Sequence, residues 1–233
     1  MRIYLVRHAE SMGNISGVLS STTDFALTEK GKRQARRAGE VLRRELSGGN
    51  VAAYCSPQMR AKQTLAEILN CLEQSSVAVT ESIDLREMDL GILEGMPFEE
   101  QERNYPQVDL ARGLSVLQAP GGESYPEIRR RVLRFLEQYG PSFDNQENVI
   151  ICSHGITLRV LTNLLLQRPD EDVNILNWME NTAITILERE KGAPFVPRCI
   201  NNYAHLQDLR TANYEQWGLF AEPEAYLQGS CRG

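Results

Sequence analysis

The chain has 233 residues, 42% of them hydrophobic and 24% charged, and its formal net charge is -6 at pH 7. This composition is that of a globular protein that buries a full core. It excludes the broad positive field that would attract nucleic acid or an anionic membrane, so neither is expected as a partner. Any anion-binding site must therefore be local.

The cysteines and the N-terminal segment indicate where the protein resides. The five cysteines form no CxxC pair, and five cannot all pair within one chain. Only four consecutive apolar or aromatic residues precede Arg7, too few for the apolar region of a signal peptide. No later apolar run approaches membrane-spanning length. We therefore expect a cytoplasmic protein with reduced thiols.

The first elements follow from apolar spacing. Residues 3–6 form a continuous apolar run, which predicts a strand buried on both faces of a parallel sheet. Arg7 and His8 stand at the carboxyl end of this strand. After a polar loop, Thr28 is expected to cap a helix whose apolar residues recur at helical spacing up to residue 46.

A second strand and helix follow the same pattern. Residues 51–55 predict a short strand, and Ser56 with Pro57 predicts the opening of a helix, the proline lying in its first turn. Arg60 also falls in that first turn. Residues 77–80 predict a third short strand.

The middle of the chain is less regular. Residues 81–96, which include Glu87, read as a loop broken by glycines. Residues 97–122 mix proline, glycine and charge and are interpreted as a cap over the site. A helix over 124–139 and a doubly buried strand over 149–152 follow.

The last elements complete the domain. His154 stands at a turn from strand to helix, and the helix is expected over 155–166. Residues 182–187 and 196–203 predict two strands, paired as a hairpin at the sheet edge. The segment 207–233 reads as an irregular tail whose aromatic side chains could pack on the domain, cover the site or join a homodimer.

Strands that alternate with helices predict an α/β fold, a three-layer open and mostly parallel sheet with helices on both faces. The domain is expected to span 1–206, with 97–122 as a small cap insertion and 207–233 packing on it. Ligand sites in such sheets lie beyond the carboxyl ends of the strands. Six polar residues fall at such ends: Arg7, His8, Ser56, Arg60, Ser153 and His154.

These residue types suit phosphoryl transfer. A neutral histidine such as His8 can attack phosphorus through one ring nitrogen if the other nitrogen donates to a fixed carbonyl. Arg7 and Arg60 carry permanent charge in a planar fork that matches phosphate oxygens. Asn14 could donate one further hydrogen bond.

The motifs resemble those of the histidine phosphatase, or phosphoglycerate mutase-like, superfamily. Residues 5–11 read LVRHAES and, with Asn14, resemble the signature RHGE[ST]xxN of that family. Further similar segments follow in the family's order: Ser56-Pro57 with Arg60 and Thr64, Leu85-Arg86-Glu87 with Gly91 and Glu94-Gly95, Pro120-Gly121-Gly122-Glu123-Ser124, and Ser153-His154-Gly155. Several separated motifs in order are far more specific than one short match.

The resemblance implies a role for each matched residue. His8 would be the phosphorylated nucleophile and His154 would stabilise the transition state. The phosphate ligands would be Arg7, Asn14 and Arg60. It implies neither a metal nor an organic cofactor.

The resemblance also implies a proton donor and substrate contacts, and positions at which this sequence departs from the family pattern help to assign them. Gly155 stands where the acid-phosphatase branch has an aspartate, which leaves Glu87 as the proton donor and later base. Ser20 stands where relatives have Gln or Thr, and it is a candidate substrate contact together with Gly155.

Three functions stay open at this point. The first is hydrolysis of a small phosphorylated metabolite through a phosphohistidine, and the second is phosphoglycerate mutase-type transfer. The third is a phosphate-ligand sensor without catalysis. Acidic residues outnumber basic ones between Pro97 and Gly113, whereas a mutase needs cations for a carboxylate, which favours hydrolysis.

Other residues receive structural interpretations. The basic residues of the helix over 30–44 and those at 129–134 are expected to form solvated helix faces. His205 is expected to have a packing role. Phe98, Tyr105 and Tyr125 could shape an apolar pocket near the cap.

Overall fold

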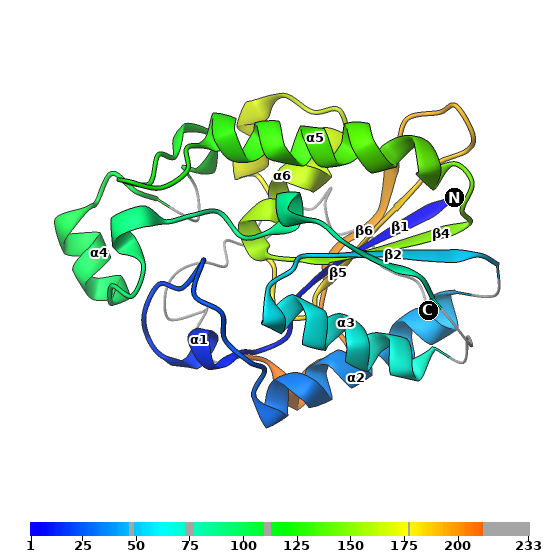
Figure 1. Cartoon of the computed structure of the whole chain (residues 1–233), viewed down its shortest axis with the longest axis horizontal. Helices are drawn as coiled ribbons and strands as arrows, with labels where there is room; N and C mark the ends of the chain where they lie inside the picture. Colours follow the sequence, from blue (N-terminus) through cyan, green and yellow to red (C-terminus); the bar gives the residue numbers. More distant parts are fainter. Residues whose placement is uncertain (47–48, 73–76, 110–112, 177, 212–233) are drawn as a thin grey trace.

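A six-stranded sheet forms the centre of the molecule (Figure 1). The computed structural model describes residues 1–46, 49–72, 77–109, 113–176 and 178–211. The strands are β1 (Arg2–Arg7), β2 (Val51–Cys55), β3 (Val79–Glu81), β4 (Asn148–Ser153), β5 (Ile184–Glu188) and β6 (Val196–Asn202). Their order is β3-β2-β4-β1-β5-β6, in which β1 to β4 are mutually parallel, β5 is antiparallel to β1, and β6 is antiparallel to β5.

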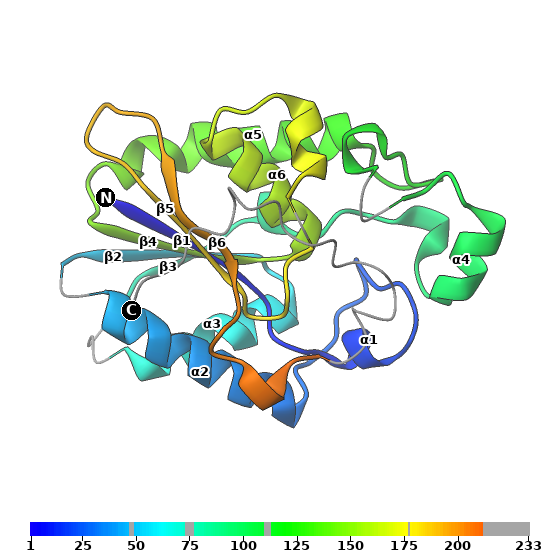
Figure 2. The same cartoon turned by 180° about the vertical axis from the view of Figure 1, so that it is seen from behind.

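Helices cover both faces of the sheet (Figures 1 and 2). One layer holds α2 (Glu29–Glu45) and α3 (Met59–Cys71), and the other holds α5 (Tyr125–Phe143) and α6 (Gly155–Leu165). Two short helices, α1 (Met12–Ile15) and α4 (Phe98–Asn104), lie beyond the carboxyl ends of the parallel strands. The predicted three-layer α/β fold is confirmed.

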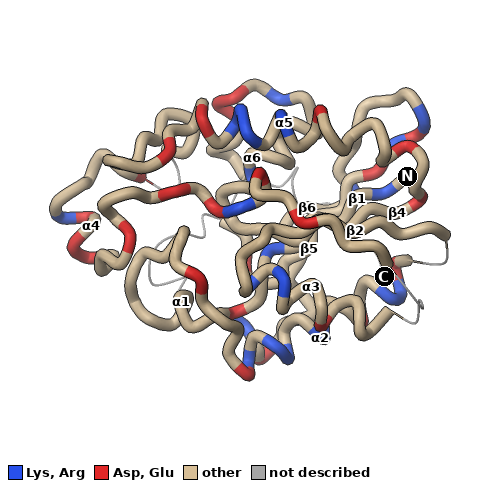
Figure 3. Tube along the Cα trace, in the orientation of Figure 1, with Lys and Arg blue, Asp and Glu red and all other residues tan. Residues whose placement is uncertain are grey.

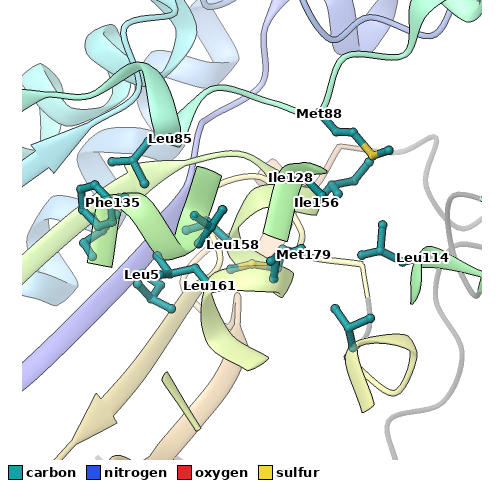
Figure 4. Packing of buried hydrophobic residues seen from close by; sticks show 14 of the residues in the cluster. Leu5, Leu85, Met88, Leu114, Ile128, Phe135, Ile156, Leu158, Leu161 and Met179 are labelled. Atoms are coloured by element: carbon teal, nitrogen blue, oxygen red, sulfur yellow. The ribbon is translucent and has the colours of Figure 1, made fainter. Parts of the chain in front are cut away.

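The layers follow from alternation along strands that are buried on both faces. In β1, Ile3 and Leu5 contribute to the core beneath α5 and α6, while Tyr4 and Val6 contribute to the core above α2 and α3. Successive side chains of a strand point to opposite faces, so one apolar run supplies both cores. Figure 4 shows Leu5 gathered with side chains of α5 and α6 in the first core.

Helix ends were predicted with mixed success. Thr28 caps α2 as expected, because its hydroxyl accepts a hydrogen bond from the Gly31 amide at 2.9 Å. Pro57 was wrongly placed in the first turn of a helix: α3 begins at Met59 and Gln58 is its N-cap, so the proline precedes the cap.

Several element bounds differ from the sequence prediction. Helix α5 continues beyond Tyr139 because Phe143, in its last turn, is buried in the core. Strand β5 begins at Ile184 rather than at Thr182, whose φ of 56° is incompatible with an extended strand. The predicted hairpin at the sheet edge is confirmed.

The basic stretch of α5 is not wholly solvated, which corrects the expectation for Arg131. This side chain is 3% exposed and pairs with the Glu123 carboxylate at 2.8 Å. Its Nη1 donates to the Asp84 carbonyl at 2.7 Å. Arg86 joins the same carboxylate at 2.7 Å, so the network ties α5 to the loop that carries Glu87.

Replacing Arg131 by alanine should lower the free energy of unfolding by about 3 kcal/mol, because it leaves a half-buried carboxylate with fewer partners. Chemical denaturation of Arg131→Ala and of the matched control Arg130→Ala, a neighbouring exposed arginine, measures this difference. Equal stabilities of the two variants would contradict the structural role of the network.

The segment after β6 packs against α2 as far as the structure describes it. The Gln34 amide donates to the Leu209 carbonyl at 2.6 Å, and the Thr211 hydroxyl donates to the Glu10 carboxylate at 3.1 Å. Residues 212–233 lie outside the described residues, so the packing of the complete tail stays a prediction. None of the described helices is long and apolar enough to cross a membrane.

Candidate active site

A pocket of about 680 Å³, a volume that includes the open solvent at its mouth, lies beyond the carboxyl end of β1, where Arg7 and His8 line it. Six residues singled out from the sequence line it: Arg7, His8, Asn14, Ser20, Arg60 and Glu87. They come from segments that are far apart in the chain, so the fold brings the predicted residues together.

The pairing of β1 with β4 joins the two histidines. Arg7 is in register with Ser153, and the His8 amide donates to the Ser153 carbonyl at 2.9 Å. His8 follows Arg7 and His154 follows Ser153, so the two histidines lie side by side. Their ring centroids are 5.1 Å apart. Both side chains are buried.

The carbonyl that orients His8 belongs to Ala9. His8 Nδ1 lies 2.8 Å from the Ala9 oxygen, so Nδ1 carries the proton and Nε2 is left with its lone pair. Burial lowers the pKa of His8 well below its ordinary value of 6.5, and the positive charges of Arg60 and Arg7 lower it further. His8 is therefore neutral, which is the state that the predicted role of nucleophile requires.

A hydrogen bond with Ser56 holds the His154 ring. Its Nε2 lies 2.8 Å from the Ser56 hydroxyl, which gives the serine of the second motif a function. Nδ1 has no hydrogen-bond partner among the described residues, although it is buried. Burial, followed by the charge of Arg60, lowers the pKa of His154 well below 6.5.

The two arginines are fixed by backbone carbonyls. Arg60 donates to the Thr23 oxygen at 3.0 Å and to the Ser21 oxygen at 2.7 Å. Arg7 donates to the Met179 oxygen, and its guanidinium lies 5.3 Å from the centroid of the Trp178 ring. These carbonyls are neutral acceptors, so they fix the two guanidinium groups without adding negative charge beside them, as suits a phosphate site.

Glu87 lies at the N-terminus of α6. Its carboxylate accepts hydrogen bonds from the amides of Ile156 at 3.3 Å and Thr157 at 3.2 Å. The Met88 amide donates to it at 3.0 Å. These donors fix the carboxyl group of Glu87, which lines the pocket together with His8.

The remaining predicted contacts have different positions. The Asn14 side-chain oxygen accepts from the Ser11 amide at 2.9 Å, which fixes the orientation of its amide group at the pocket. Ser20 lines the pocket. Gly155 packs against Trp178, whose ring would lie 3.5 Å from a Cβ there, and its contact with substrate stays a prediction.

Sequence reasoning missed the network that holds Arg60. The Glu94 carboxylate accepts from the Ser21 amide at 2.8 Å and from the Thr23 amide at 3.0 Å. Burial raises the pKa of Glu94, but hydrogen bonds from Thr23 and Ser21 outweigh it, so the pKa is lower than usual. Glu94 thus shapes the loop whose carbonyls hold Arg60.

Gln58, the N-cap residue of α3, links this loop to the proposed acid. Its side-chain nitrogen donates to the Ser21 carbonyl at 2.6 Å, and its oxygen accepts from the Glu87 amide at 2.9 Å. The matched motif that contains Glu94 was the only feature of the sequence that pointed to Glu94 or Gln58.

Replacing Glu94 by glutamine should lower kcat/KM about tenfold, because hydrogen bonds to a charged acceptor that position Arg60 are weakened. The inhibition constant of inorganic phosphate should rise in parallel, since Arg60 is expected to bind phosphate oxygens. Glu102→Gln, on the exposed face of α4, is the matched control. A Glu94→Gln enzyme with unchanged phosphate affinity would contradict this positioning role.

The lowered pKa of His8 predicts that its neutral form persists as the pH falls below 6.5. In histidine-selective NMR of the substrate-free protein, the His8 signals should titrate below that value. Arg60→Met should raise the pKa of His8, because a neighbouring cation disfavours the imidazolium. Arg36→Met, which changes an exposed arginine of α2, should leave it in place. Titration of His8 above pH 6.5 in the unmodified protein would refute the neutral nucleophile.

The family model of the histidine phosphatase superfamily (branch 1) matches residues 3–202, and the chain belongs to this family.

Curated relatives share about a third of the residues. The chain is 30% identical to 2,3-bisphosphoglycerate-dependent phosphoglycerate mutase 2 of Gloeobacter violaceus, over 84% of this chain and 91% of the mutase. It is 32% identical to the phosphoglycerate mutase-like protein AT74H of Arabidopsis thaliana, over 80% of this chain and 73% of that protein.

Solved structures share the fold. The α-ribazole phosphatase of Shigella flexneri superposes with a TM-score of 0.72 at 22% identity, over 88% of this chain and 98% of the phosphatase. A mycobacterial glucosyl-3-phosphoglycerate phosphatase superposes with a TM-score of 0.73 at 23% identity, over 86% of this chain and 98% of the other.

Proposed function

We propose that this protein hydrolyses the phosphomonoester of a small metabolite through a phosphohistidine on His8, without a metal. The observation that carries the proposal is the convergence of His8, Glu87, Arg7 and Arg60 on one pocket, with His154 packed against His8. A nucleophile, a proton donor and cations for the phosphate oxygens are the parts that phosphoryl transfer requires.

The reaction proceeds in two displacements. In the first, the lone pair of His8 Nε2 forms a bond to phosphorus while the bond to the ester oxygen breaks. Glu87 gives its proton to that oxygen. In the second, the Glu87 carboxylate takes a proton from water, whose oxygen displaces His8 from phosphorus. Inorganic phosphate leaves, and His8 and Glu87 return to their starting states.

The surrounding groups stabilise the charge that moves in each displacement. Arg7 and Arg60 bind the equatorial phosphate oxygens, and a hydrogen on His154 Nδ1 donates to one of them when Ser56 donates to Nε2. Because the arginines and the histidines are already held by the protein, little reorganisation accompanies the reaction.

Charge near the pocket supports hydrolysis over transfer to a sugar acid. Among the described residues that line the pocket, Arg7 and Arg60 are the only arginines or lysines, and both are assigned to the phosphoryl group. Helix α4, whose first residue lines the pocket, carries Glu99, Glu100 and Glu102 against Arg103 (Figure 3). A substrate carboxylate would find little positive charge there.

Phosphoglycerate mutase-type transfer is the second candidate. It is favoured by the names of relatives such as the mutase of Gloeobacter violaceus, at 30% identity over most of the chain. The two candidates share the proposed phosphohistidine and differ in whether water or a second hydroxyl accepts the phosphoryl group.

The deciding experiment assays phosphate release from a panel of phosphorylated metabolites in the presence of EDTA, alongside interconversion of 3-phosphoglycerate. We expect release by the unmodified protein and a loss of at least a thousandfold in His8→Ala, which removes the nucleophile. His205→Gln is the control, because His205 contacts the Thr182 hydroxyl and does not line the pocket. Interconversion without net release would replace hydrolysis by the mutase function.

A further inference from the structure

Hydrophobic side chains form a large share of the pocket lining, which also includes Ser11, Ser20 and Ser21. Besides the residues of the proposed chemistry, the pocket is lined by six large hydrophobic side chains: Val18, Leu19, Leu90, Phe98, Ile156 and Trp178. Phe98, Val18 and Trp178 are partly exposed, whereas Leu19, Leu90 and Ile156 are buried beneath them. A group that entered this space would cover the exposed apolar surface.

Backbone hydrogen bonds hold Val18 and Phe98, which form one wall of the pocket, in place without a ligand. Val18 forms an antiparallel bridge with Pro97, which directly precedes Phe98. The Leu19 amide donates to the Met96 carbonyl, and the Gly95 amide donates to the Leu19 carbonyl, each at 2.8 Å. Two loops are thus joined by backbone hydrogen bonds, so binding against them costs little ordering.

The charged side chains of the pocket lining all belong to the proposed chemistry. Among the described lining residues, the charged groups are Arg7, Arg60 and Glu87, all of which the proposed hydrolysis uses. A carboxylate or a second phosphate on the substrate would lose its hydration beside Phe98 and gain no described cation in return. Burying such a charge without a partner is strongly unfavourable.

We propose that the substrate's leaving group is an uncharged, largely apolar alcohol, and that Phe98 together with Val18 selects it. This inference rests on the proposed hydrolase function and narrows it. It accounts for an apolar wall at the place where an enzyme for sugar acids would need cations.

The test compares esters whose leaving groups are all primary or secondary alcohols, so that differences in chemical reactivity are small. The substrates are 2-phenylethyl phosphate, glycerol 1-phosphate and 3-phosphoglycerate. We expect kcat/KM for the phenylethyl ester to exceed that for the glycerol ester at least tenfold, as an apolar pocket of this kind discriminates by about that factor. The carboxylated ester should be the poorest.

Variants of Phe98 test whether the wall formed by Val18 and Phe98 causes the preference for an apolar leaving group. Phe98→Ala should reduce the preference for the phenylethyl ester over the glycerol ester about tenfold, chiefly through KM, and Phe98→Leu should restore part of it. Phe98→Arg should shift the preference toward 3-phosphoglycerate. Ile92→Ala is the control, because Ile92 is 55% exposed and does not line the pocket.

The outcomes separate the two proposals. Phosphate release that is equal for the three esters, or best for 3-phosphoglycerate, would overturn the apolar leaving group while the hydrolase stands. An unchanged preference in Phe98→Ala would overturn the role of Phe98. If no ester releases phosphate, the hydrolase function fails, and binding of the matching phosphonates then tests the pocket alone: tighter binding of the carboxylated one would overturn its apolar preference.

Discussion

The parallel pairing of β1 with β4 is the constraint on which the site depends. It aligns Arg7 with Ser153 and joins the His8 amide to the Ser153 carbonyl, so the residues that follow the two strands meet above the sheet edge. A slip by one residue would turn each side chain of β1 to the opposite face, so Ile3 and Leu5 would exchange cores with Tyr4 and Val6 and the packing of both cores would be lost. The same cores that stabilise the sheet therefore determine the separation of the two histidines.

The site holds positive charge next to neutral histidines. Arg7 and Arg60 are buried, and the backbone carbonyls of Met179, Thr23 and Ser21 accept hydrogen bonds from them. Burial, and then the charges of Arg60 and Arg7, lower the pKa of His8 well below 6.5, so the histidine beside these cations is neutral. An acidic protein can bind an anion in this way because the positive field is confined to one end of a pocket.

Much of this arrangement could be predicted from the sequence. Continuous apolar runs identified β1, β2 and β4, and the polar residues at their ends identified the site, because parallel strands present their carboxyl ends at one edge. Motif order then linked Glu87 and His154 to the same pocket. These predictions depend on local residue patterns and on strand order, and the spacing of apolar and polar residues in one sequence is enough to indicate both.

The features that were missed depend on contacts between distant loops. Nothing in the sequence shows that the Ala9 carbonyl orients His8 or that Trp178 lies over Arg7. The burial of Arg131 was missed because it stands in a run of basic residues with Arg129 and Arg130, and only its partner Glu123 distinguishes it. Backbone carbonyls and tertiary ion pairs leave no periodic signal.

The central claim is that His8 carries the phosphoryl group during turnover. It is tested most directly by quenching the reaction within the first turnover in neutral denaturant and locating the modified residue by mass spectrometry. The account predicts one phosphoryl group, on His8, and none in His8→Ala. Steady turnover with His8 unmodified, or a phosphoryl group found on another residue, would contradict it.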